Sequence, residues 1–227
     1  MVLMMRVKLS RYTAGLLILI LGSAPVRGDD SRTGEVFESD GLMRAETRWL
    51  VNSLERLHFS EITVEDLEMA EVIESYMEAL DYNHLYFTEK DRDAFVARFG
   101  PSMVRYLRSG NLHPAFQIFS VFQKRALEKA AWVDDYLKQD FSFDAGLVYR
   151  ADREESPWPA DESEIEDLWE RRIQFELLNE VIARMQPPPP DADGNDEEEA
   201  EDTEPLSFED ALAEAKEVVG KRYDRLE

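Results

Sequence analysis

PAFQIFSVFQKRALEKAAWVDDYLK, residues 114–138, carries the longest helical pattern in the chain. Its apolar side chains recur every three or four residues, at Ala115, Phe119, Phe122, Ala126, Ala130, Val133 and Leu137. This spacing places them on one face of an α-helix. A stripe so rich in aromatic and aliphatic side chains is typical of a packed core, so we interpret the segment as a long core helix.

Further helical patterns lie on both sides of this segment. They cover a second long segment, 162–185, and the shorter segments 41–57, 63–80, 88–99, 101–109 and 207–227. Only residues 141–149 leave room for a short extended piece. The sequence therefore predicts an all-α, multi-helix bundle-like domain with two long helices and a C-terminal helix.

Local signals define where these helices begin and end. Three hydroxyl residues precede helical patterns and have an aspartate three positions later, namely Thr63 with Asp66, Thr88 with Asp91, and Ser207 with Asp210. This spacing resembles a capping box and predicts three helix starts. Residues 81–84, Asp-Tyr-Asn-His, predict a break between helices, and Gly220 predicts a weakened or early end of the last helix.

The apolar stripes also predict which face of each helix is buried. For residues 41–57 the predicted face is Leu42, Ala45, Trp49, Leu50, Leu54 and Leu57. For residues 162–185 it is Ile165, Leu168, Trp169, Ile173, Phe175, Leu178, Val181 and Ile182. For the last helix it is Leu212, Ala215, Val218, Val219 and Tyr223.

The two ends of the predicted helical domain differ from it in composition. Residues 1–28 combine Arg6, Lys8 and Arg11 with a short apolar run over 14–21, the layout of a secretory signal peptide cleaved after Gly28. The alternative, a membrane anchor, needs about 20 apolar residues, so we expect no stable membrane span after cleavage. No cysteine follows the run, which excludes a lipoprotein anchor.

A linker is predicted between the domain and the last helix. Four prolines, 187–190, form a stiff spacer, and residues 191–204 hold nine acidic and no basic side chains. Such a composition buries too little apolar surface to offset the entropy of ordering, which predicts disorder over 187–206. The expected organisation is a signal peptide at 1–28, a helical domain at 29–186, this acidic linker, and a C-terminal helix at 207–227 that forms a possible start of a missing region.

Composition and motifs point away from several classes of function. The net charge of −23 repels phosphate backbones, so we expect no nucleic-acid partner. The chain has no cysteine, and its three histidines, His58, His84 and His113, lack the spacing of metal ligands. No G-x-S-x-G motif or phosphate-binding glycine loop is present. The sequence thus predicts no catalytic residue, no metal and no cofactor.

A proline-braced indole stands out in residues 151–172, ADREESPWPADESEIEDLWERR. Pro157 and Pro159 restrict the backbone on either side of Trp158, which lowers the entropy lost when the indole docks. We expect the loop 141–159 to fold back on the helices through Trp158, with Trp169 packed in the same region. The alternative is an exposed, partner-binding tryptophan.

Four segments together resemble a known family. They are Tyr76 to Phe87 (YMEALDYNHLYF), Arg108 to Leu112 followed by the aromatic helix, Arg153 with Ser156-Pro157-Trp158-Pro159 and later Leu168 to Arg172, and Lys221-Arg222-Tyr223. In order and spacing they resemble the N-terminal helical domain of tail-specific, or carboxy-terminal-processing, serine proteases. The motif residues are Leu80, Asp81, Tyr82, His84, Phe87, Arg153, Pro157, Trp158, Pro159, Trp169 and Arg172.

The resemblance implies a non-catalytic role. In that family a PDZ module and a peptidase core with a serine–lysine pair follow this domain, and this chain shows neither, so no catalytic residue is carried over. The implied chain is a truncated or separately encoded domain that shapes the periplasmic protease and binds substrates or an adaptor protein. Its partners would be a peptidase domain or subunit, protein substrates or an adaptor. The alternative is an independent soluble periplasmic binding or regulatory protein that reuses the domain.

Overall fold

The computed structural model describes residues 38–57, 62–144, 146–186 and 206–226. All regular secondary structure in these residues is helical, and none of them forms a strand, which confirms the all-α prediction. Within the same ranges, no helix combines the length and the apolar character that a membrane crossing requires. The predicted signal peptide and the acidic linker lie outside the described residues.

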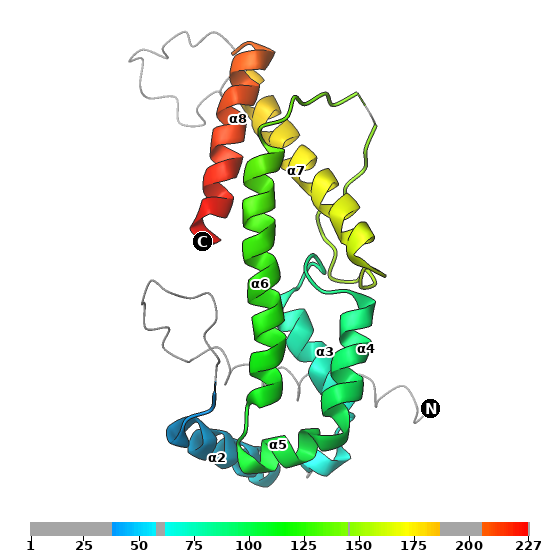
Figure 1. Cartoon of the computed structure of the whole chain (residues 1–227), viewed down its shortest axis with the longest axis vertical. Coiled ribbons are helices and arrows are strands. Elements are labelled where there is room, and N and C mark those ends of the chain that lie inside the picture. The colour runs from blue at the N-terminus through cyan, green and yellow to red at the C-terminus, as the bar shows by residue number, and fades with distance from the viewer. Residues whose placement is uncertain (1–37, 58–61, 145, 187–205, 227) are drawn as a thin grey trace, which may run out of the picture. The chain divides into compact units, whose positions relative to one another are not determined.

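The helices follow the predicted segments closely (Figure 1). They are α2 (Gly41–Leu57), α3 (Met69–Leu80), α4 (Glu89–Phe99), α5 (Met103–Ser109), α6 (His113–Tyr136), α7 (Glu162–Met185) and α8 (Phe208–Tyr223). Three short 3₁₀ turns accompany them, η1 (Val64–Asp66), η2 (Gly100–Ser102) and η3 (Asp224–Leu226). The two long helices are α6 and α7, as predicted.

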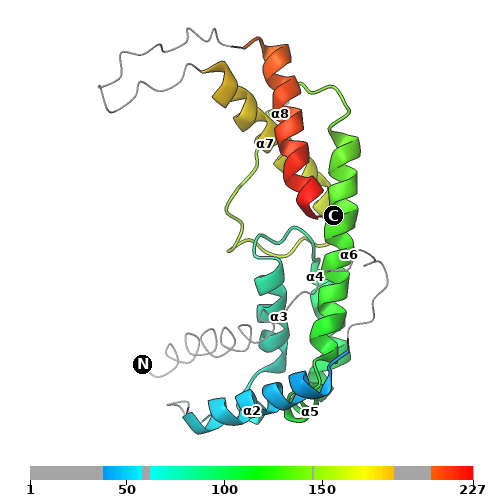
Figure 2. The same ribbon diagram turned by 90° about the vertical axis from the view of Figure 1, so that its left-hand side faces the viewer.

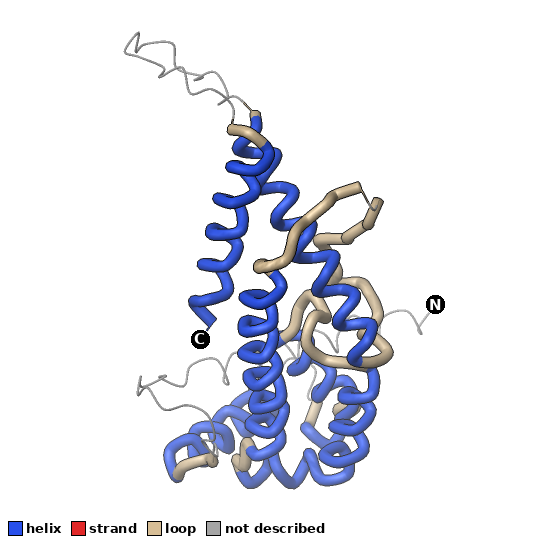
Figure 3. The backbone as a smooth tube through the Cα atoms, turned by 45° about the horizontal axis from the view of Figure 1, so that its top comes forward, coloured by secondary structure: helices blue, strands red, loops and turns tan. Residues whose placement is uncertain are grey.

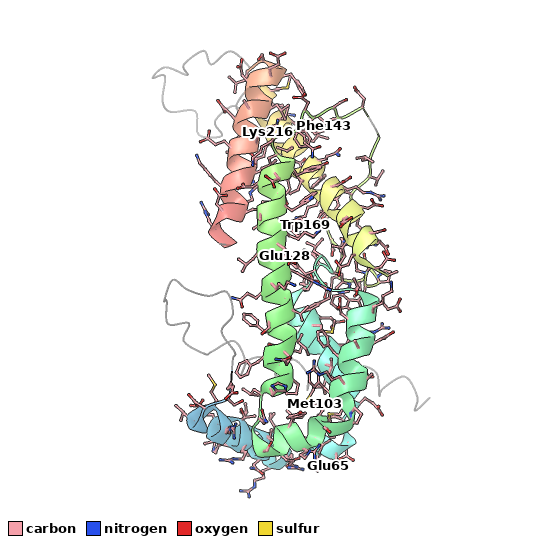
Figure 4. All side chains as sticks on the ribbon, in the orientation of Figure 1. Glu65, Met103, Glu128, Phe143, Trp169 and Lys216 are labelled. Atoms are coloured by element: carbon pink, nitrogen blue, oxygen red, sulfur yellow. The ribbon has the colours of Figure 1, made fainter. Side chains whose placement is uncertain are left out.

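The chain divides into two compact units. Unit 1 comprises the described residues of 1–124 and 152–162, and unit 2 those of 125–151 and 163–227. The first part of α6 therefore belongs to unit 1 and its last part to unit 2. Met103 marks the core of unit 1 and Trp169 the core of unit 2 in Figure 4.

Helices α2 to α6 all contribute side chains to the core of unit 1. In it α2 packs against α5 and α3 packs against α4, and α2 lies crosswise to α3 (Figure 2). Its core consists of Val51, Val64, Ile73, Met77, Phe87, Phe95, Phe99, Met103, Leu107, Ile118 and Trp158. Helices α3 and α4 supply Ile73, Met77, Phe95 and Phe99 of this core.

The predicted face of α2 is wrong in part, since Leu50 and Leu54 are half-buried but its other four residues are exposed. Leu42, Trp49 and Leu57 are 67%, 69% and 83% exposed, whereas Thr47 and Val51 are buried. Burial of Thr47 is inexpensive because its hydroxyl donates to the Met43 carbonyl at 2.8 Å. The spacing of apolar residues therefore did not predict the side of α2 that faces the core, because that side includes the buried polar residue Thr47.

Unit 2 is built around α7 and α8 with the end of α6. Buried side chains of α7 recur as Ile165, Trp169, Ile173, Leu177 and Val181, and those of α8 as Ala211, Ala215, Val219 and Tyr223. The prediction for α7 was wrong for Phe175 and Ile182, which are 37% and 42% exposed, and it missed Leu177. Figure 3 shows the loop after α6 arching beside α7, without a strand in its described residues.

The helix boundaries test the local signals directly. The Thr88 hydroxyl accepts from the Asp91 N–H and the Asp91 carboxylate accepts from the Thr88 N–H, so this capping box is confirmed. Ser207 caps α8 as predicted. The Thr63 N–H donates to the Asp66 carboxylate, as a capping box requires, but this pair precedes the 3₁₀ turn η1, and α3 starts only at Met69. Gly220 does not end α8, because the helix continues to Tyr223.

Candidate functional site

The motif residues gather into two clusters, one in each unit. We call the first the Trp158 lock; it joins the turn 81–88 after α3 to the segment 153–159 before α7. The second, the Trp169 cluster, joins α7 to α8. Leu80 ends α3 beside the turn and is partly buried against the unit 1 core.

Asp81 closes the turn of the Trp158 lock. Its carboxylate, in a residue only 2% exposed, accepts hydrogen bonds from the backbone N–H groups of Leu85 (2.7 Å), Tyr86 (2.7 Å) and Phe87 (2.9 Å). Burial raises the pKa of the Asp81 carboxyl above its ordinary value, and the three N–H donors oppose this rise. With both oxygens engaged, this carboxylate holds the backbone in place.

His84 connects the turn to the second segment. It is buried, and its Nδ1 lies 2.7 Å from the backbone carbonyl oxygen of Ser156; because that oxygen can only accept, Nδ1 carries a hydrogen and donates the hydrogen bond. Its ring stacks on Trp158 with 3.7 Å between centroids. Its φ of 52° is a left-handed conformation that a non-glycine residue rarely adopts, and these contacts hold it there.

Backbone contacts fix the segment before α7 in register. The Arg153 N–H donates to Asn83 Oδ1 at 3.4 Å, and Arg153 Nε donates to the Asn83 carbonyl at 3.2 Å. The Tyr82 hydroxyl donates to Glu154. At the far end, the carbonyl of the buried Pro159 accepts from the Glu89 N–H, the first residue of α4, at 2.8 Å. Hydrogen bonds thus connect residues that lie about 70 positions apart in the sequence.

Trp158 fills the centre of the lock. Its side chain is 7% exposed and packs edge-on against the buried Phe87, with 6.1 Å between ring centroids. Pro157, by contrast, is exposed. The burial agrees with the anchor interpretation, and it contradicts the alternative of an exposed, partner-binding Trp158.

The Trp169 cluster is a separate arrangement in unit 2. Trp169 is fully buried and meets Tyr223 with 5.8 Å between ring centroids. Arg172 Nε donates to the Tyr223 hydroxyl at 3.0 Å and to Glu176 Oε1 at 2.9 Å, and the Tyr223 hydroxyl donates to the same Oε1 at 2.9 Å. Burial raises the pKa of Tyr223, which keeps its hydroxyl protonated.

The prediction that Trp169 packs in the same region as Trp158 is therefore wrong. The two indoles belong to different units, because the boundary between the units falls at the start of α7, between Glu162 and Ser163. Sequence reasoning also missed Glu176. Its position four residues after Arg172 on a helix is the signal that could have identified it.

In both clusters the buried polar side chains have hydrogen-bond partners within the protein. Among the described residues, no buried side-chain nitrogen or oxygen lacks a hydrogen-bond partner. In the same part of the chain, no group of three or more histidine, aspartate or glutamate residues is placed to hold a metal ion. What these side chains do is join segments that are distant in sequence, and so fix the relative positions of helices within each unit.

A comparison with protein-family models gives a match over residues 50–225, to the tail specific protease N-terminal domain. The chain belongs to this family. The match confirms the resemblance of the four motif segments. A tail-specific protease of Haemophilus influenzae is 27% identical over 133 residues, which cover 59% of this chain and 19% of the relative. The chain thus matches less than a fifth of the length of that tail-specific protease.

Proposed function

We propose that the chain acts as the non-catalytic N-terminal helical domain of a tail-specific serine endopeptidase. In this role it shapes the protease and binds protein substrates or an adaptor protein. The observation that carries the proposal is the match of residues 50–225 to the tail specific protease N-terminal domain.

The geometry of the two clusters supports an architectural role. The family resemblance rests on residues such as Asp81, His84 and Trp158. These side chains form hydrogen bonds within the protein or pack in its core. Arg172 is likewise engaged with Glu176 and Tyr223. Side chains used in this way build rigid helical units on which a binding surface can be presented.

Cleavage measurements test the non-catalytic part of the proposal. The purified full chain is incubated with an unstructured peptide, and the peptide is followed by mass spectrometry. We expect no turnover. Turnover that is abolished by a single substitution within this chain would overturn the proposal.

A second measurement tests the domain role. The purified chain is mixed with the tail-specific peptidase encoded in the same genome, and the mixture is run on a size-exclusion column. We expect co-elution. If the chain elutes as a free monomer at micromolar concentrations, the independent binding or regulatory protein becomes the better description.

The proposed location is the periplasm of a Gram-negative-type envelope. It is supported by the layout of residues 1–28, with three basic residues followed by an apolar run. N-terminal sequencing of the protein from the envelope fraction tests it. We expect the mature chain to begin at Asp29, and a chain that stays in the cytosol with Met1 intact contradicts export.

A further inference from the structure

Unit 2 exposes a row of large apolar side chains on the side of α7 away from its buried face. Leu147, Phe175, Ile182, Met185 and Phe208 are 50%, 37%, 42%, 41% and 43% exposed. Together with the half-buried Leu178 we call them the α7 apolar surface. Phe175, Leu178, Ile182 and Met185 follow one another at spacings of three and four residues, so they form one stripe of the helix.

Ring contacts join the loop after α6 to this stripe on one side and to the start of α8 on the other. Tyr149 lies 5.4 Å from Phe175 between ring centroids, and Phe143 lies 6.2 Å from Phe208. Leu147, Phe175 and Leu178 line one pocket together with Phe143 and Tyr149. Three segments that are separate in sequence thus build one continuous apolar surface, which is a recognised mark of an interaction site.

The dimensions of this surface favour a protein partner over a small molecule. The pocket holds about 60 Å³, whereas small-molecule sites usually enclose ~300–1,000 Å³. It accepts the end of one apolar side chain. The stripe from Phe175 to Met185 runs for about 15 Å at the rise of an α-helix, a length that about three turns of a partner helix can cover.

Charge defines the chemistry of that partner. Arg171 lines the pocket, while Asp140 and Asp144 lie within three residues of Phe143 in sequence, and Glu209 and Asp210 within two of Phe208. By sequence, the nine acids of 191–204 are tethered between Met185 and Phe208, two residues of the surface, although they are not part of it. The whole chain carries a net charge of −23, which attracts a cationic partner.

We propose that the α7 apolar surface binds an amphipathic helix of a partner protein whose apolar stripe is flanked by lysine and arginine. This inference rests on the binding role proposed above and assigns that role to a place. The partner helix lies along α7, inserts one apolar side chain into the pocket beside Phe175, and places its cationic side chains near the acids at the rim.

Four synthetic helical peptides of 18 residues test the proposal by fluorescence anisotropy with the purified full chain. The first carries leucine at spacings of three and four residues and lysine elsewhere. The second and third replace the lysines with glutamine or glutamate. The fourth keeps the lysines and replaces the leucines with serine. We expect the first peptide to bind at least about tenfold more tightly than each of the others.

Matched variants locate the binding. The Leu147→Ser, Phe175→Ser double variant is expected to bind the first peptide about tenfold more weakly, and Ile182→Ser provides a second, independent variant. Leu57→Ser is the control, because Leu57 is 83% exposed on α2 in unit 1, and we expect it to bind as the parent chain does. Melting curves confirm that each variant folds.

Each other outcome overturns the proposal. If the fourth peptide, with lysine and serine, binds as tightly as the first, the attraction is due to charge alone. If the glutamate peptide binds as tightly, the partner is not cationic. If the unit 2 variants bind the first peptide as the parent chain does, or if no peptide binds, the α7 apolar surface is not the binding site. A dimer of the free chain that Phe175→Ser dissociates shows that a second copy covers the surface. None of these results bears on the peptide-cleavage and co-elution tests of the domain assignment, so the two failures are distinguishable.

Discussion

Trp158 shows how one side chain can hold together segments that lie far apart in the sequence. It stacks on His84 and packs against Phe87, while the carbonyl of neighbouring Pro159 accepts from the first residue of α4. Burial of a tryptophan removes ~150–250 Å² of surface from water, or roughly 4–6 kcal/mol at about 25 cal/mol per Å². The proline on each side reduces the entropy lost on docking.

Truncation of Trp158 tests this role. We expect Trp158→Ala to lower the free energy of unfolding by about 3–5 kcal/mol, because a large cavity opens in the unit 1 core. Urea unfolding followed by circular dichroism measures the change. Trp49→Ala is the matched control, since Trp49 is 69% exposed, and it should change stability by less than about 0.5 kcal/mol. Equal effects of the two substitutions would argue against the lock.

Gly110 is required by both its backbone conformation and its surroundings. It ends α5 with φ of 68°, and a Cβ added there would lie 2.2 Å from the carbonyl oxygen of Arg44. Gly146 has a similar φ of 61°, but an added Cβ would meet nothing within 4 Å. An alanine at Gly146 would therefore introduce only backbone strain, whereas an alanine at Gly110 would introduce the same strain and a steric clash.

We predict that Gly110→Ala destabilises the protein by about 3 kcal/mol or more, since backbone of α2 must move in addition to the strain. Gly146→Ala should cost only about 1–2 kcal/mol, the usual penalty for a left-handed alanine. Thermal and urea unfolding of both variants provide the comparison. Similar losses at the two positions would show that α2 does not approach Gly110 closely.

Tyr76 gives a pH dependence whose sign can be derived. Burial raises its pKa to about 12, whereas a tyrosine in the unfolded chain ionises near 10. Above about pH 10 the unfolded chain loses this proton first, so the free energy of unfolding falls as the pH rises towards 12. We expect Tyr76→Phe to make this fall shallower in unfolding curves at pH 9 to 12. An identical slope in the variant would contradict the burial of the hydroxyl.

At the residue scale, the sequence predicted local interactions but not distant partners. Thr88 and Asp91 are three positions apart, and their capping box was correctly predicted. The proline-braced Trp158 was correctly expected to be buried. Its partner His84 lies more than 70 positions away, and no local pattern encodes such a contact, since it arises only when α3, α4 and the later segment pack together.

At the scale of elements, α8 is joined to α7 by a polar cluster and one ring contact. Ala211, Ala215 and Val219 recur every fourth residue along α8 and are fully buried, so they form its buried face. A Cβ on Gly220 would be 3.5 Å from Leu137, which follows α6, and this is an ordinary contact, so α8 has room for an alanine there. Tyr223 then ends the interface through its bonds with Arg172 and Glu176.

Removal of one hydroxyl tests this interface. We predict that Tyr223→Phe lowers the free energy of unfolding by about 1–2 kcal/mol, because it leaves Glu176 and Arg172 with one partner fewer in a buried setting. Tyr82→Phe is the matched control. Tyr82 also donates to a glutamate, Glu154, but is 55% exposed, so water replaces the lost bond. Equal losses in urea unfolding would show that burial does not strengthen the Tyr223 bonds.

The sequence predicted the helices better than their orientation. The bounds of α7 were predicted as Glu162 to Met185, as observed. Its buried face was predicted only in part, because apolar side chains occur around much of the helix and several stripes satisfy the same spacing. Which stripe is buried depends on neighbouring helices, as the exposed Phe175 and Ile182 show. The same reason explains the exposed Trp49 on α2.

At the scale of the whole molecule, two units share one continuous helix. The boundary between units falls inside α6, between Lys124 and Arg125, where the helical pattern has no interruption. Proline and glycine usually reveal a domain boundary, and neither occurs there. The sequence therefore gave no sign that Trp158 and Trp169 stabilise different units.

Hydrogen exchange measured by mass spectrometry tests most directly whether the motif tryptophans form two separate locks. Trp158→Ala should accelerate amide exchange mainly in α3 and α4, and Trp169→Ala mainly in α7 and α8, because each removes packing from its own unit. Trp49→Ala should leave the pattern of the parent chain unchanged. The account is contradicted if either core substitution accelerates exchange equally in both units. It is also contradicted if a core substitution accelerates exchange in neither unit, because the Trp158 lock and the Trp169 cluster would then not stabilise separate units.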